Sequence, residues 1–243
     1  AASTEISEDQ LVRVTVEDDD PRYKERLRAA KDLVKVETDR AKILDQIDKS
    51  QGAIVSRFRR LQTLLKDHGF TDGWRLTEKG TILRSIFHEC DLVIAESVVD
   101  GLFDGLSAPD LCGVMSCFVF EPRGDDEFVT KIGGVAGERV RRIERLSASI
   151  RDDEKTLGIT QHRGLHRGFF DTARDWCSGS SLEDILSEDL QPGDFVRTMR
   201  QIADLLRQLG EVSENEKTRA AAREAAHSVL RGVVLASIGG VEA

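Results

Sequence analysis

The chain has 243 residues, and its 40% of hydrophobic residues can bury a substantial core in one large domain or two small ones. Aromatic residues make up only 5% and there are 4 prolines, so helix is favoured over sheet and the expected fold class is mostly all-α. The formal net charge of -9 repels polyanions at long range, so contact with nucleic acid would have to come from local basic faces.

The cysteines and the lack of long apolar runs bear on the compartment. No CxxC pair and no secretory leader is present, which favours a reduced, cytoplasmic setting with buried thiols at Cys90, Cys112, Cys117 and Cys177. No apolar run approaches the roughly 20 residues that span a bilayer, so no membrane partner is expected. The chain opens with Ala-Ala-Ser-Thr rather than Met, which predicts a fragment or a processed product.

The first fifth of the chain is rich in charge. Residues 1–20 contain an acidic run and are expected to form an extended or disordered arm. Residues 21–49 begin with Pro21 and carry sparse apolar positions, a pattern typical of a long, solvated helix that acts as a stalk or spacer.

Residues 50–80 predict a small winged-helix-like element. An apolar stripe over 50–68 indicates a second helix, which Gly69 would end. Residues 69–76 then read as a turn with short extended pieces. Thr77 is a suitable N-cap for a further helix that runs through Ile82 and Leu83 to Phe87.

Residues 81–238 predict an irregular helical bundle. Helices are expected at 91–100, 109–120, 134–157, 168–177, 195–209 and 216–235, with a short one from the hydroxyl cap at Ser180-Ser181 to Leu186.

Motifs for catalysis or cofactor binding are missing from the sequence. It has no P-loop and no G-x-G-x-x-G after a strand. The acidic runs 125–127 and 152–154 point around a helix or loop, and His88-Glu89-Cys90-Asp91 lacks the second histidine of a zinc motif. We therefore expect no cofactor in this chain, and no elbow motif marks a nucleophile.

The helix over residues 194–209 carries the strongest functional signal. Its apolar side chains share one side: Phe195, Met199, Ile202, Leu205, Leu206 and Leu209. The other side is lined by Arg197, Gln201, Asp204 and Gln208, with Arg200 and Arg207 at its edge. Arginine and glutamine at one-turn spacing can contact successive phosphates or bases of a single strand. An ordinary amphipathic helix with a wet face would show the same spacing.

Three strings carry a resemblance to a known family. The first is Leu76-Thr77-Glu78-Lys79-Gly80 followed by residues 86–96, and the second, its continuation, is residues 101–111 and 116–123. The third is spread over the distal half of the chain: Gly168-Phe169, Trp176, Gly179, Leu182, residues 193–197 and residues 204–208. Over roughly residues 50–238, the chain resembles the C-terminal DSHCT domain of superkiller-type, superfamily-two RNA helicases, and most closely the actinobacterial HelY group.

The resemblance implies a function. In that family two upstream RecA-like domains of the same polypeptide hydrolyse ATP with Mg²⁺, and the helical domain completes a channel for the 3′ strand. The helix over 194–209 would be the family's ratchet helix, with single-stranded RNA or DNA contacted by Arg197, Arg200, Gln201, Asp204 and Gln208. Residues 21–49 would be a remnant of the arch or stalk. Glu89, Asp91 and Glu96 match an acidic helix, whose role is either hydrogen bonding across the bundle or strand contact.

Three hypotheses follow. The first is an accessory helicase domain that guides single-stranded nucleic acid past the motor domains in RNA processing or decay. The second is a helical protein-interaction module that uses residues 21–48 and 134–157 and binds no nucleic acid. The third is an enzyme for small molecules that uses the histidines and cysteines.

Overall fold

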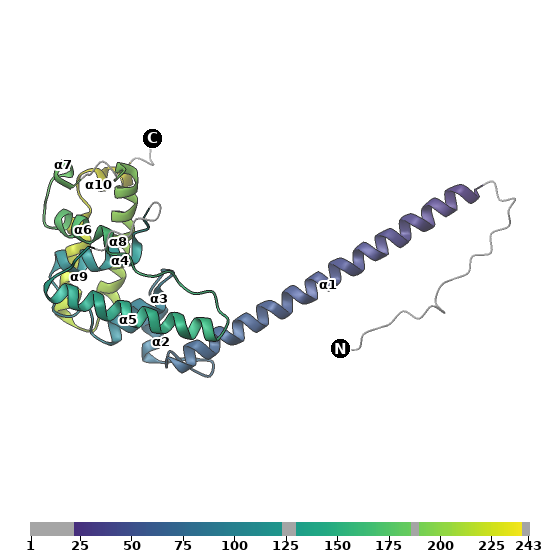
Figure 1. Cartoon of the computed structure of the whole chain (residues 1–243), viewed down its shortest axis with the longest axis horizontal. Helices are drawn as coiled ribbons and strands as arrows, with labels where there is room; N and C mark the ends of the chain where they lie inside the picture. The colour runs from purple at the N-terminus through teal and green to yellow at the C-terminus, as the bar shows by residue number, and fades with distance from the viewer. Residues whose placement is uncertain (1–21, 123–129, 186–189, 240–243) are drawn as a thin grey trace. The chain divides into compact units, whose positions relative to one another are not determined.

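The structure is a computed structural model that describes residues 22–122, 130–185 and 190–239 (Figure 1). The chain divides into two units, residues 1–57 and 58–243, and helix α1, Tyr23–Asp67, contributes to both. The arm expected over residues 1–20 and the acidic run at 125–127 lie outside the described residues.

Helix α1 is continuous, so the expectation of two helices that part near residue 49 is wrong. A single interior glycine, Gly52, costs a helix only about 1 kcal/mol, and no proline interrupts the run. Every described side chain from Arg22 to Arg57 is exposed, so this part of α1 is a charge-rich, solvated helix.

A small hairpin follows α1. Gly69 ends the helix with a positive φ of 73°, and the amide of Phe70 donates to the carbonyl of Leu65 over 2.8 Å. Strands β1, Thr71–Asp72, and β2, Arg75–Leu76, pair antiparallel. The segment expected to be winged-helix-like therefore consists of the end of α1, this two-residue-stranded hairpin and the start of α2.

Helix α2, Glu78–Leu83, begins as the sequence predicts. The hydroxyl of Thr77 accepts a hydrogen bond from the amide of Gly80 over 3.0 Å, which caps the helix. Its expected continuation to Phe87 is wrong. The amides of Ser85 and Ile86 donate to carbonyls three residues back, which tightens and ends the last turn.

The remaining helices build a bundle around α4, Ala108–Val119 (Figure 1). Helix α4 packs against the second half of the chain, contacting α6, α8 and α9. The other elements of this part are α3, Asp91–Val99; α5, Gly134–Thr156; the 3₁₀ turn η2, Arg167–Phe169; α6, Phe170–Cys177; α7, Leu182–Ile185; α8, Pro192–Val212; α9, Glu216–Val229; and α10, Gly232–Gly239. The mostly all-α fold class is confirmed.

The core is packed tightly around α4 and α6. A Cβ added to Gly113 on α4 would lie 2.7 Å from the ring of Phe170, so only glycine lets these two helices approach this closely. Trp176 packs edge-on against Phe195 at 5.1 Å, and its indole N–H donates to the carbonyl of Val229. The four cysteines are buried and free, as expected.

The helix predicted over 216–235 is two helices, α9 and α10, with a break at residues 230–231. Arg231 lies over the ring of Trp176 at 3.6 Å and donates to the carbonyls of Trp176 and Ser180. Gly232 follows with a positive φ of 50°. The break is therefore made by contacts with α6, which local periodicity does not record.

Candidate nucleic-acid interface

Helix α8 has two sharply different faces. Its apolar residues Phe195, Met199, Ile202 and Leu206 are fully buried in the bundle. Its exposed side chains recur at separations of three or four residues, which places them on one face. From Arg197 onward they are Arg197, Arg200, Gln201, Asp204, Arg207 and Glu211.

Four of the five residues predicted to contact a strand are therefore exposed, and the fifth is not. Gln208 is only 8% exposed, so its predicted place on the wet face is wrong. Its Oε1 accepts from the backbone N–H of Phe87 over 2.7 Å, and its Nε2 donates to Asp204 over 2.9 Å. The residues around Phe87, 121 positions away in sequence, lie over this end of the helix and cover Gln208.

A groove of about 750 Å³ runs along the exposed face of α8. Three arginines and one aspartate line it, with the segment between α2 and α3 on the other side: Phe87, His88, Gly193, Val196, Arg197, Arg200, Gln201, Asp204, Leu205, Arg207 and Leu230. Arg197 is bound to Asp194 at 3.4 Å. Within the part of the chain that the structure describes, Arg200 and Arg207 make no ion pair, so their guanidinium groups are available to an anion.

A second hollow, of about 870 Å³, shares His88, Arg197 and Gln201 with the groove. Its other arginine, Arg163, is engaged within the protein. Arg163 donates to the carbonyls of Phe118 and Phe120 and pairs with Glu89 and Glu121. The available positive charge of this region therefore belongs to α8.

His88 stands where the two hollows meet, and it is neutral. Burial, together with the nearby charge of Arg163, lowers the pKa of His88, and Glu89 offsets this only in part. Its Nδ1 accepts from the backbone N–H of Cys90 over 3.1 Å, so the ring proton is on Nε2. His88 is thus a hydrogen-bond donor with no net charge.

The second hollow is lined by two histidines and three carboxylates, His88, His166, Glu89, Glu121 and Asp194. Within the described residues, no cysteine or serine lines either hollow, and no group of histidine, cysteine, aspartate and glutamate could hold a metal ion. Burial raises the pKa of Cys90 to about 12, so its thiol stays protonated and unreactive.

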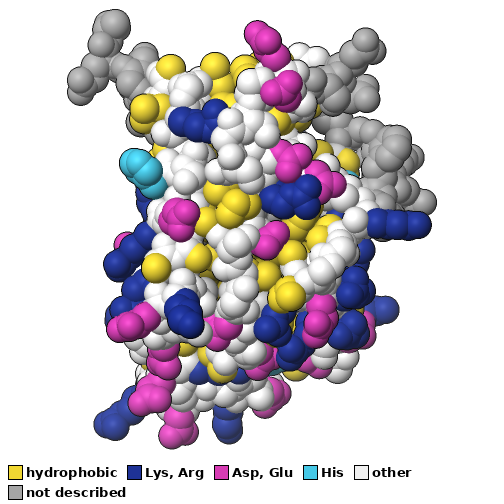
Figure 2. Space-filling model, turned by 90° about the vertical axis from the view of Figure 1, so that its left-hand side faces the viewer, with side chains coloured by type: hydrophobic (Ala, Val, Ile, Leu, Met, Phe, Trp, Pro, Cys, Tyr) yellow, Lys and Arg dark blue, Asp and Glu magenta, His cyan; other side chains and the backbone are white. Residues whose placement is uncertain are grey.

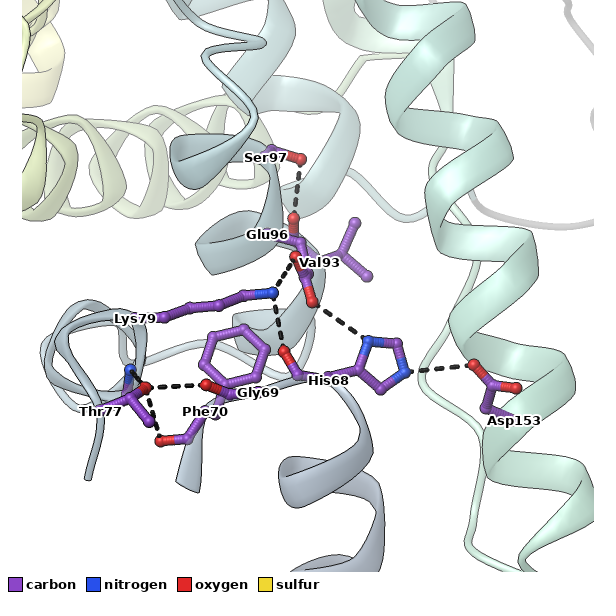
Figure 3. A network of polar contacts seen from close by, with 10 residues as sticks. His68, Gly69, Phe70, Thr77, Lys79, Val93, Glu96, Ser97 and Asp153 are labelled. Carbon is purple, nitrogen blue, oxygen red and sulfur yellow. Dashed lines mark hydrogen bonds and ion pairs between the residues drawn. The ribbon is translucent and has the colours of Figure 1, made fainter. Parts of the chain in front are cut away.

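Glu96, whose role the sequence left open, lies in a buried polar network (Figure 3). Its two carboxylate oxygens contact Nζ of Lys79 at 2.6 Å and Nδ1 of His68 at 3.1 Å. The other ring nitrogen of His68 lies 3.1 Å from Asp153 on α5. Glu96 therefore ties the end of α1 and helix α2 to helices α3 and α5.

The other two acidic residues also have partners within the protein. Asp91 accepts from the backbone N–H of Leu92 over 2.6 Å, and burial raises the pKa of its carboxyl group. Glu89 is half exposed and pairs with Arg163. Glu96 and Glu89 therefore bond to other parts of the bundle, whereas the bond of Asp91 is local to the start of α3, and the alternative of strand contact stays a prediction.

The sequence did not single out Phe87 or His88 as part of this face. Phe87 was placed in an apolar helix stripe, but the helix ends before it and the residue is 77% exposed. No local signal separates such a residue from a core phenylalanine. Figure 2 shows one face of the molecule, on which basic and acidic side chains are interspersed.

Comparison with known proteins gives consistent matches. A family model described as the DSHCT (NUC185) domain matches residues 73–237. The chain is 32% identical to "Probable helicase HelY" of Mycobacterium tuberculosis over 97% of this chain and 28% of that protein. It is 29% identical to "Probable helicase HelY" of Mycobacterium leprae, over 88% of this chain and 25% of that protein.

A more distant relative is "Exosome RNA helicase MTR4" of Homo sapiens, 27% identical over 60% of this chain and 14% of that protein. The chain thus spans little more than a quarter of the HelY proteins that it matches. In the described part of the chain, no helix combines the length and apolar character needed to cross a membrane. The resemblance read from the sequence is confirmed, and the chain belongs to the DSHCT domain family.

Proposed function

We propose that this chain is an accessory domain of an ATP-dependent helicase and guides single-stranded nucleic acid along the exposed face of α8. The proposal rests on one observation above all. Arg197, Arg200 and Arg207 line a groove together with Gln201, and two of these arginines make no ion pair among the described residues. Guanidinium groups one turn apart can follow the phosphates of an extended strand.

Binding of a nucleic acid to this acidic chain would depend on short-range contacts with the arginines of α8. A net charge of -9 opposes a polyanion, but charges further away than about 10 Å are largely screened at 0.1 M salt. With Arg197 paired to Asp194, Arg200 and Arg207 against Asp204 leave the groove with a small positive charge. If each arginine neutralises one phosphate, the logarithm of the affinity falls with the logarithm of salt concentration with a slope of about -2.

The motor would lie elsewhere in the same polypeptide. The chain contains no P-loop sequence, so ATP and Mg²⁺ would be held by upstream RecA-like domains. Closure of those domains would supply directed movement, while α8 holds the strand between steps. Since one relative is named an exosome RNA helicase, RNA in processing or decay is the first strand to test, with DNA beside it.

The test is fluorescence anisotropy of labelled single-stranded RNA and DNA at low and physiological salt. We expect salt-dependent binding by this chain, and a loss of about tenfold or more in the Arg197→Ala, Arg200→Ala variant. The matched control is Arg141→Ala, Arg142→Ala, which removes the same charge from exposed positions on α5. Equal losses in the two double variants, or no binding by the unmodified chain, would contradict the proposal.

A second candidate is a protein-interaction module, favoured by the first part of α1. Apolar side chains are exposed there, as Leu33, Val34, Val36, Ile43 and Leu44 illustrate. Binding of a protein partner that does not weaken with salt, together with no affinity for oligonucleotides, would support this function instead.

A further inference from the structure

Phe87 is an aromatic side chain held in solvent at the edge of the groove. The residue is 77% exposed, while Ile86 before it and Cys90 after it are buried. It lines the groove opposite the basic face of α8. A large apolar side chain presented beside arginines is suited to a partner that has both an apolar face and negative charge.

The backbone at Phe87 is fixed even though the ring is free. The N–H of Phe87 donates to Oε1 of Gln208 over 2.7 Å. The side-chain Nε2 of Gln208 in turn donates to Asp204 over 2.9 Å, so one buried glutamine connects Phe87 with the exposed face of α8. The backbone that carries the ring is therefore held at a constant place relative to Arg200 and Gln201, so only the side-chain torsions of Phe87 remain to be ordered by an incoming group.

We propose that Phe87 is a stacking platform for one base of the strand, and that Gln208 is the residue that positions it. This inference rests on the proposed function and deepens it. Arg197, Arg200 and Arg207 meet the phosphates, and Phe87 meets a base across the groove. Every base has a π face, so stacking on Phe87 gives affinity without strict sequence preference.

The rival occupant of Phe87 is an apolar side chain of a neighbouring protein domain. The groove argues against it, because its three arginines would have to be stripped of water or paired there. The two occupants differ in one measurable respect. Only a stacked base makes the contribution of Phe87 depend on whether the oligonucleotide carries bases.

The experiment measures the affinity of each protein variant for each of two oligonucleotides. This chain, Phe87→Ala and Phe87→Trp are titrated into labelled oligouridine and into the same oligonucleotide with a central run of abasic sites. Removal of one stacked base or of its platform is expected to weaken binding about 5- to 100-fold. Phe87→Trp is expected to bind at least as tightly as the unmodified chain, since tryptophan offers a larger face.

The matched control is Trp74→Ala. Trp74 is 83% exposed, so its loss removes an exposed aromatic ring as Phe87→Ala does, but Trp74 does not line the groove. We expect Trp74→Ala to leave affinity within twofold of the unmodified chain. A Gln208→Met variant tests the positioning role, and it is expected to lose affinity for oligouridine more than for the abasic oligonucleotide.

The decisive quantity is the coupling between ring and base. The inference predicts that Phe87→Ala weakens binding of oligouridine strongly and binding of the abasic oligonucleotide little. Equal effects on both oligonucleotides, or none on either, would overturn it. If binding then still requires Arg197 and Arg200, the proposed strand contact stands and only stacking fails; if the unmodified chain binds neither oligonucleotide, both fail.

Discussion

Gln208 offers the sharpest test of how the groove is built, because its side chain lies inside the protein and not on the wet face of α8. Gln208→Met keeps the length of the side chain and removes both hydrogen bonds. The N–H of Phe87 then has no acceptor in a site where the glutamine was 8% exposed. A fully buried donor without an acceptor costs about 1–3 kcal/mol, this donor is partly buried, and the bond to exposed Asp204 adds little.

We therefore expect the free energy of unfolding to fall by about 1–2 kcal/mol, after a small gain from the apolar methionine. Urea unfolding followed by far-ultraviolet circular dichroism measures this quantity, with the slope against urea unchanged. Gln201→Met on the exposed face is the control and should change stability by no more than about 0.5 kcal/mol. If Gln208→Met is as stable as Gln201→Met, the reasoning that Gln208 holds the segment around Phe87 is refuted.

Three further predictions concern the rest of the bundle. Glu96→Gln leaves Lys79 without its charge partner and should destabilise the fold by about 2–4 kcal/mol in urea unfolding. Glu89→Gln, whose carboxylate is half exposed, should cost less than about 1 kcal/mol, because Arg163 keeps its other partners. Because folding lowers the pKa of His88, the imidazole binds a proton at a higher pH in the unfolded chain than in the folded one. The free energy of unfolding should therefore fall as the pH drops below about 6.5, and it should fall less steeply in the His88→Asn variant. All four buried thiols should resist a thiol reagent in the native protein at pH 8 and react after unfolding; rapid native labelling would contradict their burial.

The helices were predictable because their signals are local. The apolar stripe of α8, the hydroxyl cap at Thr77 and the stop at Gly69 depend on residues within a turn or two of one another. The same signals set which face of α8 is wet, so the exposure of Arg197, Arg200, Gln201 and Asp204 followed from spacing. The errors concern the continuity of α1, the end of α2, the burial of Gln208 and the break after α9, and in the last two a tertiary contact outweighs a local preference.

The break between α9 and α10 illustrates such an error. Nothing between residues 216 and 235 marks it strongly, apart from a glycine that a helix tolerates at a cost of about 1 kcal/mol. Arg231 leaves the helix because it can stack on Trp176 and donate to two carbonyls in and after α6. Those partners lie more than fifty residues away in the sequence.

The sequence by itself determined the helical class, the amphipathic character of α8 and the membership in the DSHCT family, since composition, periodicity and motif order are properties of the chain. Only the tertiary structure decided that Gln208 is covered, that Phe87 is presented beside α8 and that Glu96 holds four helices together. Each depends on which distant segment lies against a given face. Burial and hydrogen bonding are properties of pairs that meet in space, and 121 residues separate Phe87 from Gln208.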